Sequence, residues 1–381
     1  MTEKSMYLDI LNNTIRQLQR SIKMNDAPIR AYNRGPRHIR TVVRHYNGEE
    51  IRELVVLNVG FDSCAWNNCR MCGLSTKAEK LTEDMLMAEL EELSKLPHLK
   101  DKTVNSLYFS PYSFFSDREM SESAREKVYC EIINANPNIK HIVFMTRPEY
   151  LTEEKIAHMR KFLQKQEIKI WMGLETADEF INKYCIDKGY TIEEVDKASA
   201  KLKKYDVGTG VWAMLKVPFL TEKEGVQCAV HTIRQCLNRG YDVRLMPCEI
   251  MDYTVANELY KMNAFTAPYL WSVFEVLKQF GKDEHMKIDV SGPHFERNWD
   301  VVPKEIHSSH IYKYPSNCHN CNEAAMELIF EYNQKKDISI FDTLDCECKK
   351  DWLEEMARES KPIKDRLADE YLSVINYIVS R

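Results

Sequence analysis

The sequence predicts an α/β fold around a mainly parallel sheet, because short apolar runs alternate with segments of helical spacing along most of the chain. Six such runs are separated by helices, an order that is typical of βαβ units. Polar or charged residues follow the runs, and in a parallel sheet these strand ends lie at one edge. Six repeats fit a partial (β/α) barrel as well as an open doubly wound sheet. The predicted strands cover residues 54–60, 104–109, 140–145, 168–174, 209–217 and 242–247.

Length and composition limit the class of protein. A chain of 381 residues suits one barrel-sized domain with a small addition. No apolar run approaches the roughly 20 residues of a membrane span, and the polar N-terminus lacks a signal-peptide core, so we expect a cytoplasmic protein with no membrane partner. A net charge of −5 does not indicate a protein that binds nucleic acid over its whole surface. Twelve cysteines in a reducing compartment favour metal ligation over disulfides.

The first 49 residues form a basic segment that we expect to be helical and then extended. Helical spacing covers residues 8–24, and residues 27–46 contain five arginines and no acid. Such a run can grip a phosphate backbone, or it can be a solvated or acid-paired edge of the sheet. The arginines are Arg30, Arg34, Arg37, Arg40 and Arg44.

A loop with three cysteines follows the first predicted strand. Cys64, Cys69 and Cys72 lie within nine residues, so their thiolates can converge on one soft metal centre. A [4Fe–4S] cluster normally takes four cysteines, and three would leave one iron open to bind another molecule. The alternatives are a zinc site that lacks its fourth ligand, or thiols that pack as small hydrophobic groups. No glycine-rich dinucleotide fingerprint stands at this position.

Polar side chains at the ends of the later strands are the second candidate feature. Because parallel strands end at one edge, we expect these side chains near the cysteine loop. Each has a simpler explanation: a pair with a neighbouring acid, a helix cap, or exposure to solvent. The residues are Ser110, Ser113, Arg147, Glu175 and Lys216.

Two further cysteine pairs lie near the C-terminus. They are Cys318 with Cys321, and Cys346 with Cys348. Two pairs at this separation indicate a four-thiolate zinc site or an auxiliary iron–sulfur cluster, with an absence of metal as the alternative. Three histidines nearby are candidate replacement ligands: His307, His310 and His319. We expect residues 291–381 to form a small helical subdomain that carries these cysteines.

The cysteine loop resembles the cluster motif of radical S-adenosylmethionine (radical SAM) enzymes. It has an aromatic residue inside the motif and Gly73 after it, although four residues separate its first two cysteines where the family usually has three. Further segments resemble, in order, the branch related to the elongator catalytic subunit, and within it the archaeosine-type tRNA-modifying proteins. These segments cover residues 113–117, 147–150, 173–176, 187–189, 215–220 and 268–271.

The resemblance implies a partial (β/α)6 barrel over residues 50–290, with a [4Fe–4S] cluster and S-adenosylmethionine at its top. In that family a reductant such as flavodoxin or ferredoxin drives cleavage to a 5′-deoxyadenosyl radical, which abstracts hydrogen from the substrate. The archaeosine-type enzyme acts with a partner that attaches lysine to a 7-deazaguanine in tRNA, and the radical step then breaks a C–N bond. The alternatives are a radical SAM enzyme for a small molecule or natural product, and a non-catalytic, metal-stabilised RNA-binding module.

The resemblance also implies contacts with the cofactor. Ser110 and Ser113 stand where the family offers polar contacts to the methionine moiety. Arg147 is a carboxylate clamp, because a guanidinium binds carboxylate bidentately. Glu175 is expected to bond an amino or ribose hydroxyl group. Trp66 is expected to shield the cluster and pack against adenine, with ordinary core packing as the alternative.

Three charged residues are the candidates for catalytic roles. Lys216 is expected to hold a carboxylate of the substrate, beside Arg147 and Glu175 at the same edge of the barrel. A primary carbon radical has to be kept away from water, so a shielded pocket is expected around these groups.

Overall fold

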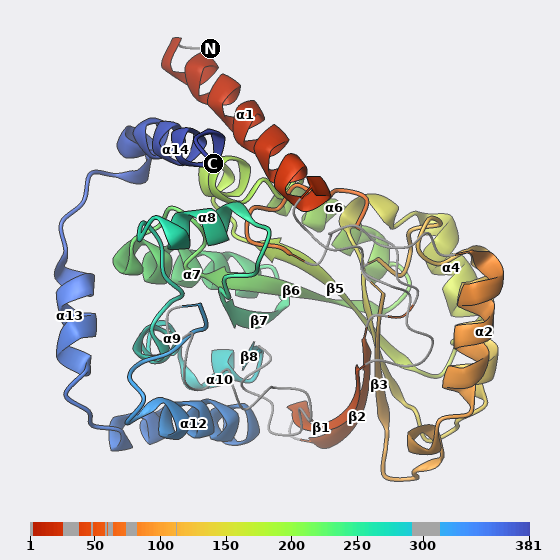
Figure 1. Ribbon diagram of the computed structural model, residues 1–381. Helices are drawn as coiled ribbons and strands as arrows, with labels where there is room; N and C mark the ends of the chain where they lie inside the picture. Colours follow the sequence, from red (N-terminus) through yellow and green to blue (C-terminus); the bar gives the residue numbers. More distant parts are fainter. Residues whose placement is uncertain are drawn as a thin grey trace.

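The computed structural model describes residues 3–25, 38–46, 49–57, 59, 64–73, 82–111, 113–291 and 313–381. The side chains of residues 3, 4, 38, 40, 45 and 46 lie outside this description. Eight strands form one curled sheet in the order β1 to β8, so each strand pairs with its neighbour in the sequence (Figure 1). This is the partial barrel that the sequence predicts.

All neighbouring strands from β2 onwards run parallel, and only β1 is antiparallel to its partner. The six predicted strands correspond to β2 to β7, and the sheet gains β1 and β8 at its two edges. The strands are β1 (His38–Tyr46), β2 (Glu49–Leu57), β3 (Ser106–Ser110), β4 (His141–Met145), β5 (Glu167–Glu175), β6 (Val207–Leu215), β7 (Asp242–Pro247) and β8 (Ile288–Val290).

Helices cover the outer face of the sheet (Figure 1). Several begin at a threonine or serine cap; at α7, Thr221 and Glu224 form a reciprocal capping box. The main helices are α1 (Glu3–Asn25), α2 (Glu83–Ser94), α3 (Glu122–Lys127), α4 (Glu153–Phe162), α6 (Ile192–Lys203), α7 (Glu222–Leu237), α8 (Val255–Lys261), α9 (Leu270–Leu277), α12 (Asn322–Lys335), α13 (Lys349–Ala357) and α14 (Ile363–Val379). Shorter turns are η1 (Pro97–Lys100), η2 (Val128–Asn134), η3 (Pro148–Tyr150), α5 (Glu179–Ile181), η4 (Asn182–Ile186), α10 (Lys282–His285) and η6 (Ile338–Thr343). No helix in the described ranges is long and apolar enough to cross a membrane.

The two faces of the sheet differ in chemistry. Side chains alternate along a strand, and in β3 Leu107 and Phe109 join the main hydrophobic core beneath the helices. Tyr108, on the other face, packs with Trp171 of β5 inside the curl. Ser106 lines a cavity there. The interior of this barrel is therefore aromatic and polar, unlike the packed apolar layers of a closed barrel.

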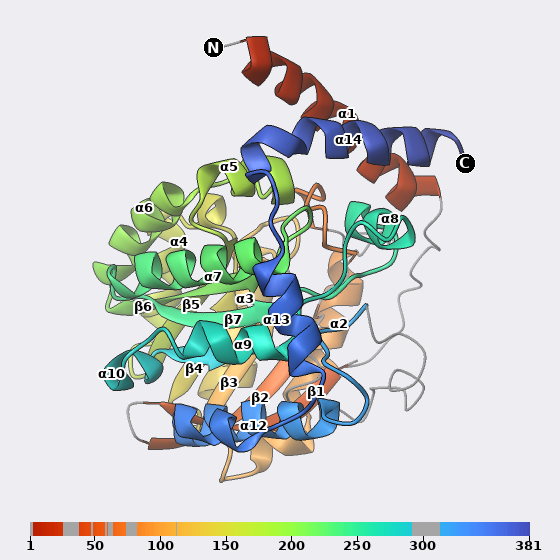
Figure 2. The same ribbon diagram turned by 90° about the vertical axis from the view of Figure 1, so that its left-hand side faces the viewer.

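Helix α12 spans the gap between the two edge strands of the curled sheet (Figures 1 and 2). Asn333 accepts a hydrogen bond from Val290 N at 2.8 Å and donates one to Val290 O at 2.7 Å, so it takes the place of a neighbouring strand beside β8. Gln334 donates to Val43 O in β1 at 2.8 Å. Adjacent residues of one helix thus join β8 to β1.

The first and last helices, α1 and α14, pack against each other beyond the carboxyl ends of the strands (Figures 1 and 2). Ile15 of α1 and Leu367 of α14 are fully buried in a second hydrophobic cluster. This cluster also contains Cys69 and Met71 of the cysteine loop. Both ends of the chain therefore help to cover that loop.

Candidate active site

The cysteine loop, residues 64–73, lies beyond the carboxyl end of β2, and backbone hydrogen bonds fix it to two other elements. Arg70 N donates to Ile186 O at 2.9 Å, and Ala256 N at the start of α8 donates to Arg70 O at 3.1 Å. Gln19 of α1 donates to Cys69 O at 3.3 Å and accepts from Val255 N at 2.6 Å. The loop is thus held from α1, η4 and α8 at once.

Arg70 anchors the loop from inside. Its side chain is fully buried and donates to Tyr371 Oη at 2.6 Å and to Asn12 Oδ1. The guanidinium lies 5.0 Å from the Tyr371 ring centroid, and Tyr371 donates in turn to Tyr184 O. Because buried polar groups are costly when left unbonded, this network sets one position for the backbone between Cys69 and Cys72.

The three cysteines of the loop share one electrostatic environment. Burial raises the pKa of Cys69 to about 12; the charge of Lys188 opposes this shift, and the neighbouring sulfurs of Cys72 and Cys64 add to it. The same three sulfurs act on Lys23 of α1, whose pKa is lowered by burial. Lys23 donates to the Asn67 side chain at 3.0 Å, which places its charge beside the loop. The three sulfurs thus lie within electrostatic range of one lysine.

Arg147 and Trp66 lie together beside the cysteine loop. Trp66 donates from Nε1 to Asp187 O at 2.6 Å, and Arg147 lies 5.2 Å from the Trp66 ring and 4.7 Å from the Tyr190 ring. The charge of Arg147 also acts on Cys69. Arg147 is 6% exposed and forms an ion pair with Glu149. This is the pair with a neighbouring acid that the sequence analysis gave as the simpler explanation.

Glu175 forms a buried ion pair with a lysine that the sequence analysis did not select. Lys188 Nζ lies 2.9 Å from Glu175 Oε1, while Glu175 Oε2 has no hydrogen-bond partner among the described residues. Burial alone would lower the pKa of Lys188, but Glu175, Tyr190 and Cys69 together raise it. A Cβ atom on Gly173 would come within 2.6 Å of Glu175 Oε1 and 2.8 Å of Lys188 Nζ, so a glycine there leaves room for the pair.

Lys216 is buried and fully paired. Its ammonium lies 2.8 Å from Glu222 Oε2 and donates to Thr266 Oγ1 at 3.0 Å. The charges of Lys216 and Glu175 both act on the buried thiol of Cys248, so the ends of β5, β6 and β7 meet here. The alternative that Lys216 is solvated does not hold.

The two serines are buried, and they differ in their bonding. Ser110 Oγ donates to Pro111 O at 3.1 Å. Ser113 N donates to Glu119 at 2.6 Å, but Ser113 Oγ has no hydrogen-bond partner within the described part of the chain. An unbonded buried hydroxyl is a candidate ligand contact.

Glu249, just after β7, is a further candidate that the sequence analysis did not select. Burial raises the pKa of the Glu249 carboxyl group to about 8. The only signal in the sequence is its place directly after a predicted strand.

The four C-terminal cysteines converge, as their spacing predicts. Their Sγ atoms all lie within 4.8 Å of one another. The separations are 3.7 Å for Cys318–Cys321, 3.6 Å for Cys318–Cys346 and 3.5 Å for Cys321–Cys348. Trp271 Nε1 donates to Cys348 Sγ at 3.5 Å. His319 does not belong to this group, and His307 and His310 lie outside the described residues.

The basic segment can be followed only in part. Arg30, Arg34 and Arg37 lie outside the described residues, and of Arg40 only the backbone in β1 is described. Arg44 pairs with Glu53 of β2 at 2.6 Å. For Arg44, therefore, the acid-paired edge is correct and a solvent-facing contact to a phosphate backbone is not.

Comparisons with known proteins give a family match that includes the cysteine loop. Residues 59–227 match the model of the Radical SAM superfamily. An archaeosine synthase subunit beta from Methanosarcina acetivorans is 25% identical over 90% of this chain and 94% of its own length. An uncharacterized protein of Methanocaldococcus jannaschii is 27% identical over 77% of this chain and 79% of its own. A second archaeosine synthase subunit beta, from Thermococcus kodakarensis, is 23% identical over 74% of this chain and 84% of its own length.

Two solved structures align with part of this chain at low sequence identity. The Elp3 of Methanocaldococcus infernus aligns with a TM-score of 0.45 and 17% identity, over 74% of this chain and 63% of that one. Methylornithine synthase aligns with a TM-score of 0.45 and 14% identity, over 85% of this chain and 93% of its own. The family match covers the cysteine loop and the strands that follow it as far as β6. Residues 59–227 therefore match a radical SAM domain, and the chain is similar over most of its length to two archaeosine synthase β subunits.

Proposed function

We propose that this enzyme binds a [4Fe–4S] cluster through Cys64, Cys69 and Cys72 and acts on a 7-deazaguanine base of tRNA. The cluster assignment is carried by one observation: three cysteines lie on one fixed loop, and all three sulfurs interact electrostatically with Lys23. Their sulfurs do not all fall within 4.8 Å, unlike the C-terminal four. A cube of several irons separates its thiolates more widely than a single ion does, so a spacing above 4.8 Å favours a cluster over one zinc ion.

The surrounding charge also fits that group. A cluster with three thiolates is anionic, and three buried or half-buried cations, Lys23, Lys188 and Arg147, act on these sulfurs. When bound, the cluster supplies the electron that cleaves S-adenosylmethionine. The protein contributes cations that are already in position to offset the negative charge of the cluster.

The remaining residues position the cofactor and exclude water. Arg147 clamps its carboxylate, and Glu175 Oε2, which has no partner, accepts from its amino or ribose hydroxyl group. Ser113 Oγ, also without a partner, gives a second polar contact, with Ser110 beside it. Trp66 covers the site from the side of Asp187. When substrate binds, Lys216 leaves its ion pair with Glu222 and pairs with a carboxylate of the substrate.

For the C-terminal cysteines we propose a structural zinc ion. A tetrahedral zinc site with Zn–S bonds of about 2.3 Å has sulfurs separated by about 3.8 Å. The observed separations of 3.5 to 3.7 Å are close to this value. An auxiliary iron–sulfur cluster needs wider spacing, so zinc is the better fit.

Cluster reconstitution tests the radical SAM chemistry. The full chain, treated anaerobically with iron and sulfide, is expected to become brown and to release 5′-deoxyadenosine under dithionite. Cys69→Ala should abolish both, and Cys130→Ser, at an exposed cysteine, should change neither. A cluster-loaded protein that never cleaves S-adenosylmethionine would refute the proposal.

The tRNA substrate is supported by the names of two relatives, one of which aligns over 90% of the chain. We expect salt-dependent tRNA binding that weakens when Arg34, Arg37 and Arg40 are neutralised together. We also expect turnover to require a lysine-transferring partner protein and a flavodoxin- or ferredoxin-type reductant. An enzyme for small molecules would show no loss of affinity, and a non-catalytic RNA-binding module would keep tRNA binding but make no 5′-deoxyadenosine.

A further inference from the structure

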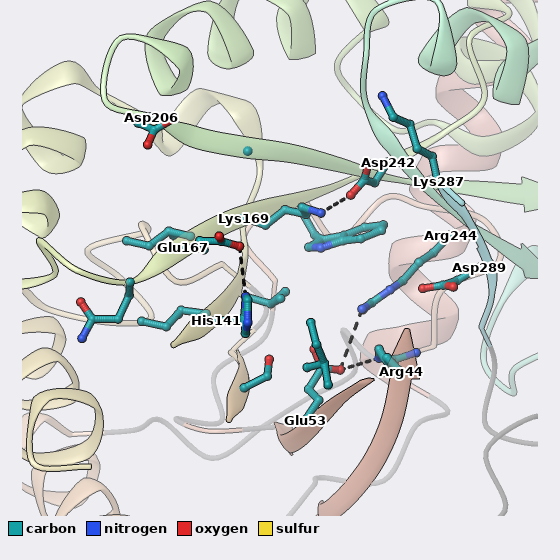
Figure 3. A pocket seen from close by; sticks show the side chains of 18 of the residues that line it. Arg44, Glu53, His141, Glu167, Lys169, Asp206, Asp242, Arg244, Lys287 and Asp289 are labelled. Carbon is teal, nitrogen blue, oxygen red and sulfur yellow. Dashed lines mark hydrogen bonds and ion pairs between the residues drawn. The ribbon is translucent and has the colours of Figure 1, made fainter. Parts of the chain in front are cut away.

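A cavity lies inside the barrel at the amino ends of the strands, opposite the cysteine loop. It has a volume of about 780 Å³, within the usual range for sites that bind small molecules. Its walls come from the starts of seven strands, and Figure 3 shows charged side chains from them pointing inward. They include Glu53, His141, Lys169, Asp242 and Arg244.

Among the described side chains, the innermost charges of this cavity do not balance. Arg44 pairs with Glu53 at 2.6 Å, and Arg244 approaches the same Glu53 oxygen only to 3.9 Å (Figure 3). Asp289 pairs with Lys336. Among the described side chains of this cluster, three cations therefore face two carboxylates. The side chains of Glu53, Arg244 and Lys336 are 3%, 4% and 5% exposed, so water compensates little of the excess positive charge.

Polar atoms without partners here are all donors. Arg244 Nε and Trp171 Nε1 are buried and have no hydrogen-bond partner among the described residues, and the same holds for Trp212 Nε1. The guanidinium of Arg244 lies 4.2 Å from the Trp171 ring centroid and 5.6 Å from that of Trp212. Three neighbouring N–H groups therefore have no acceptor among the described residues, and a ligand that accepts hydrogen bonds would satisfy them.

An aromatic layer separates this cavity from the cysteine edge. Tyr108, Trp171 and Trp212 pack together with Val143 across the interior of the curl. Gly210 of β6 leaves space for the Trp171 indole, since a Cβ atom there would come within 2.4 Å of the ring. The cavity is therefore a site of its own, on the far side of this layer from the radical chemistry.

We propose that this cavity binds a small organic monocarboxylate, held by Arg244 and the indole N–H of Trp171. One negative charge completes the balance of the buried cluster, and a carboxylate accepts from a guanidinium and an indole together. A phosphate group carries about −1.5 to −2 at neutral pH, which exceeds the single unmatched positive charge beside Glu53. This inference goes beyond the proposed function and does not depend on it.

Calorimetric titration of the full chain tests the assignment, with benzoate, acetate and inorganic phosphate as probes. We expect one benzoate per chain, weaker acetate binding and no phosphate binding. Arg244→Gln should weaken benzoate binding by at least about tenfold, because a charged hydrogen bond is lost. Trp171→Phe keeps a ring but loses the donor, and should weaken binding by about threefold or more.

Two control variants define the location. Lys287→Gln removes an exposed positive charge at the rim and should leave the benzoate affinity unchanged. Cys69→Ala, at the other end of the barrel, should also leave it unchanged. The inference is wrong if none of the carboxylates binds, if phosphate binds in their place, or if benzoate binding survives both Arg244→Gln and Trp171→Phe. Should Arg244→Gln fail to fold, Trp171→Phe alone decides the question.

Discussion

Arg70 of the cysteine loop and Tyr371 of α14 are joined by a 2.6 Å hydrogen bond, although 301 positions separate them in the sequence. Tyr371→Phe removes this acceptor and leaves a buried guanidinium partly unbonded. We expect the free energy of unfolding to fall by about 1–3 kcal/mol and the reconstituted protein to retain less iron. Urea denaturation and iron analysis measure the two effects. Tyr377→Phe on the same helix is the matched control, and equal behaviour of the two variants would show that the contact is unimportant.

The four C-terminal cysteines lead to a prediction about metal content. Purified protein should contain about one zinc per chain, and Cys346→Ser should remove it and lower the free energy of unfolding by roughly 4 kcal/mol or more. A Cys64→Ala, Cys69→Ala, Cys72→Ala variant should keep its zinc, because the two sites are separate. Elemental analysis with Cys130→Ser as control checks this. Iron and sulfide in place of zinc in the triple variant would instead identify an auxiliary cluster.

Gly210 and Gly208 lie two residues apart on β6 and allow a matched pair of substitutions. Gly210→Ala would put a methyl group 2.4 Å from the Trp171 ring, whereas at Gly208 the nearest atom is 3.4 Å away. We expect Gly210→Ala to lower the free energy of unfolding by about 1–3 kcal/mol and Gly208→Ala to change it by less than about 0.5 kcal/mol. Denaturant titration compares them, and near-ultraviolet circular dichroism reports the Trp171 environment. Two neutral variants would mean that the indole moves without cost.

Asp289 predicts a pH dependence of stability. Burial alone would raise the pKa of Asp289, but Lys336, Arg44 and Arg244 outweigh it and lower the pKa to about 2. A carboxylate with a lowered pKa stabilises the fold above its ordinary pKa of 3.8, and this contribution is lost as the pH falls towards 2. Asp289→Asn should therefore cost about 2 kcal/mol at pH 7 and progressively less from pH 4 downwards.

Denaturation curves of wild type and Asp289→Asn between pH 7 and pH 3 measure this difference. Asp283→Asn, at an exposed aspartate of α10, is the control. If the difference between wild type and Asp289→Asn stays constant over this range, the ion pairs around Asp289 do not set its charge.

Strands β2 to β7 were predictable because each is a run of five to nine residues rich in apolar side chains. The edge strands were not. Strand β8 has three residues with a central aspartate, too short for a periodic signal. Strand β1 has only a short run of Thr41, Val42 and Val43 between Arg40 and Arg44, so it shows no clear period of two. For Arg44, an acid on the next strand decides the conformation, and the local sequence does not show it.

The convergence of the four C-terminal cysteines could be predicted from their spacing, and their sulfurs lie within 4.8 Å of one another. The pairing of Glu175 with Lys188 could not, since it depends on how η4 turns back over the strand ends. The polar interior was missed for a different reason. Glu53, Lys169 and Arg244 lie on three different strands, and only the curl of the sheet brings these charges together.

Asn333 and Gln334 have a consequence for the behaviour of the protein at high concentration. A strand at the margin of a sheet exposes amide and carbonyl groups onto which another molecule can add a strand of its own. Asn333 occupies both groups of Val290, and Gln334 occupies the carbonyl of Val43. Two amide side chains on one helix thus protect both margins against intermolecular strand addition, and their loss would favour aggregation before it altered any chemistry.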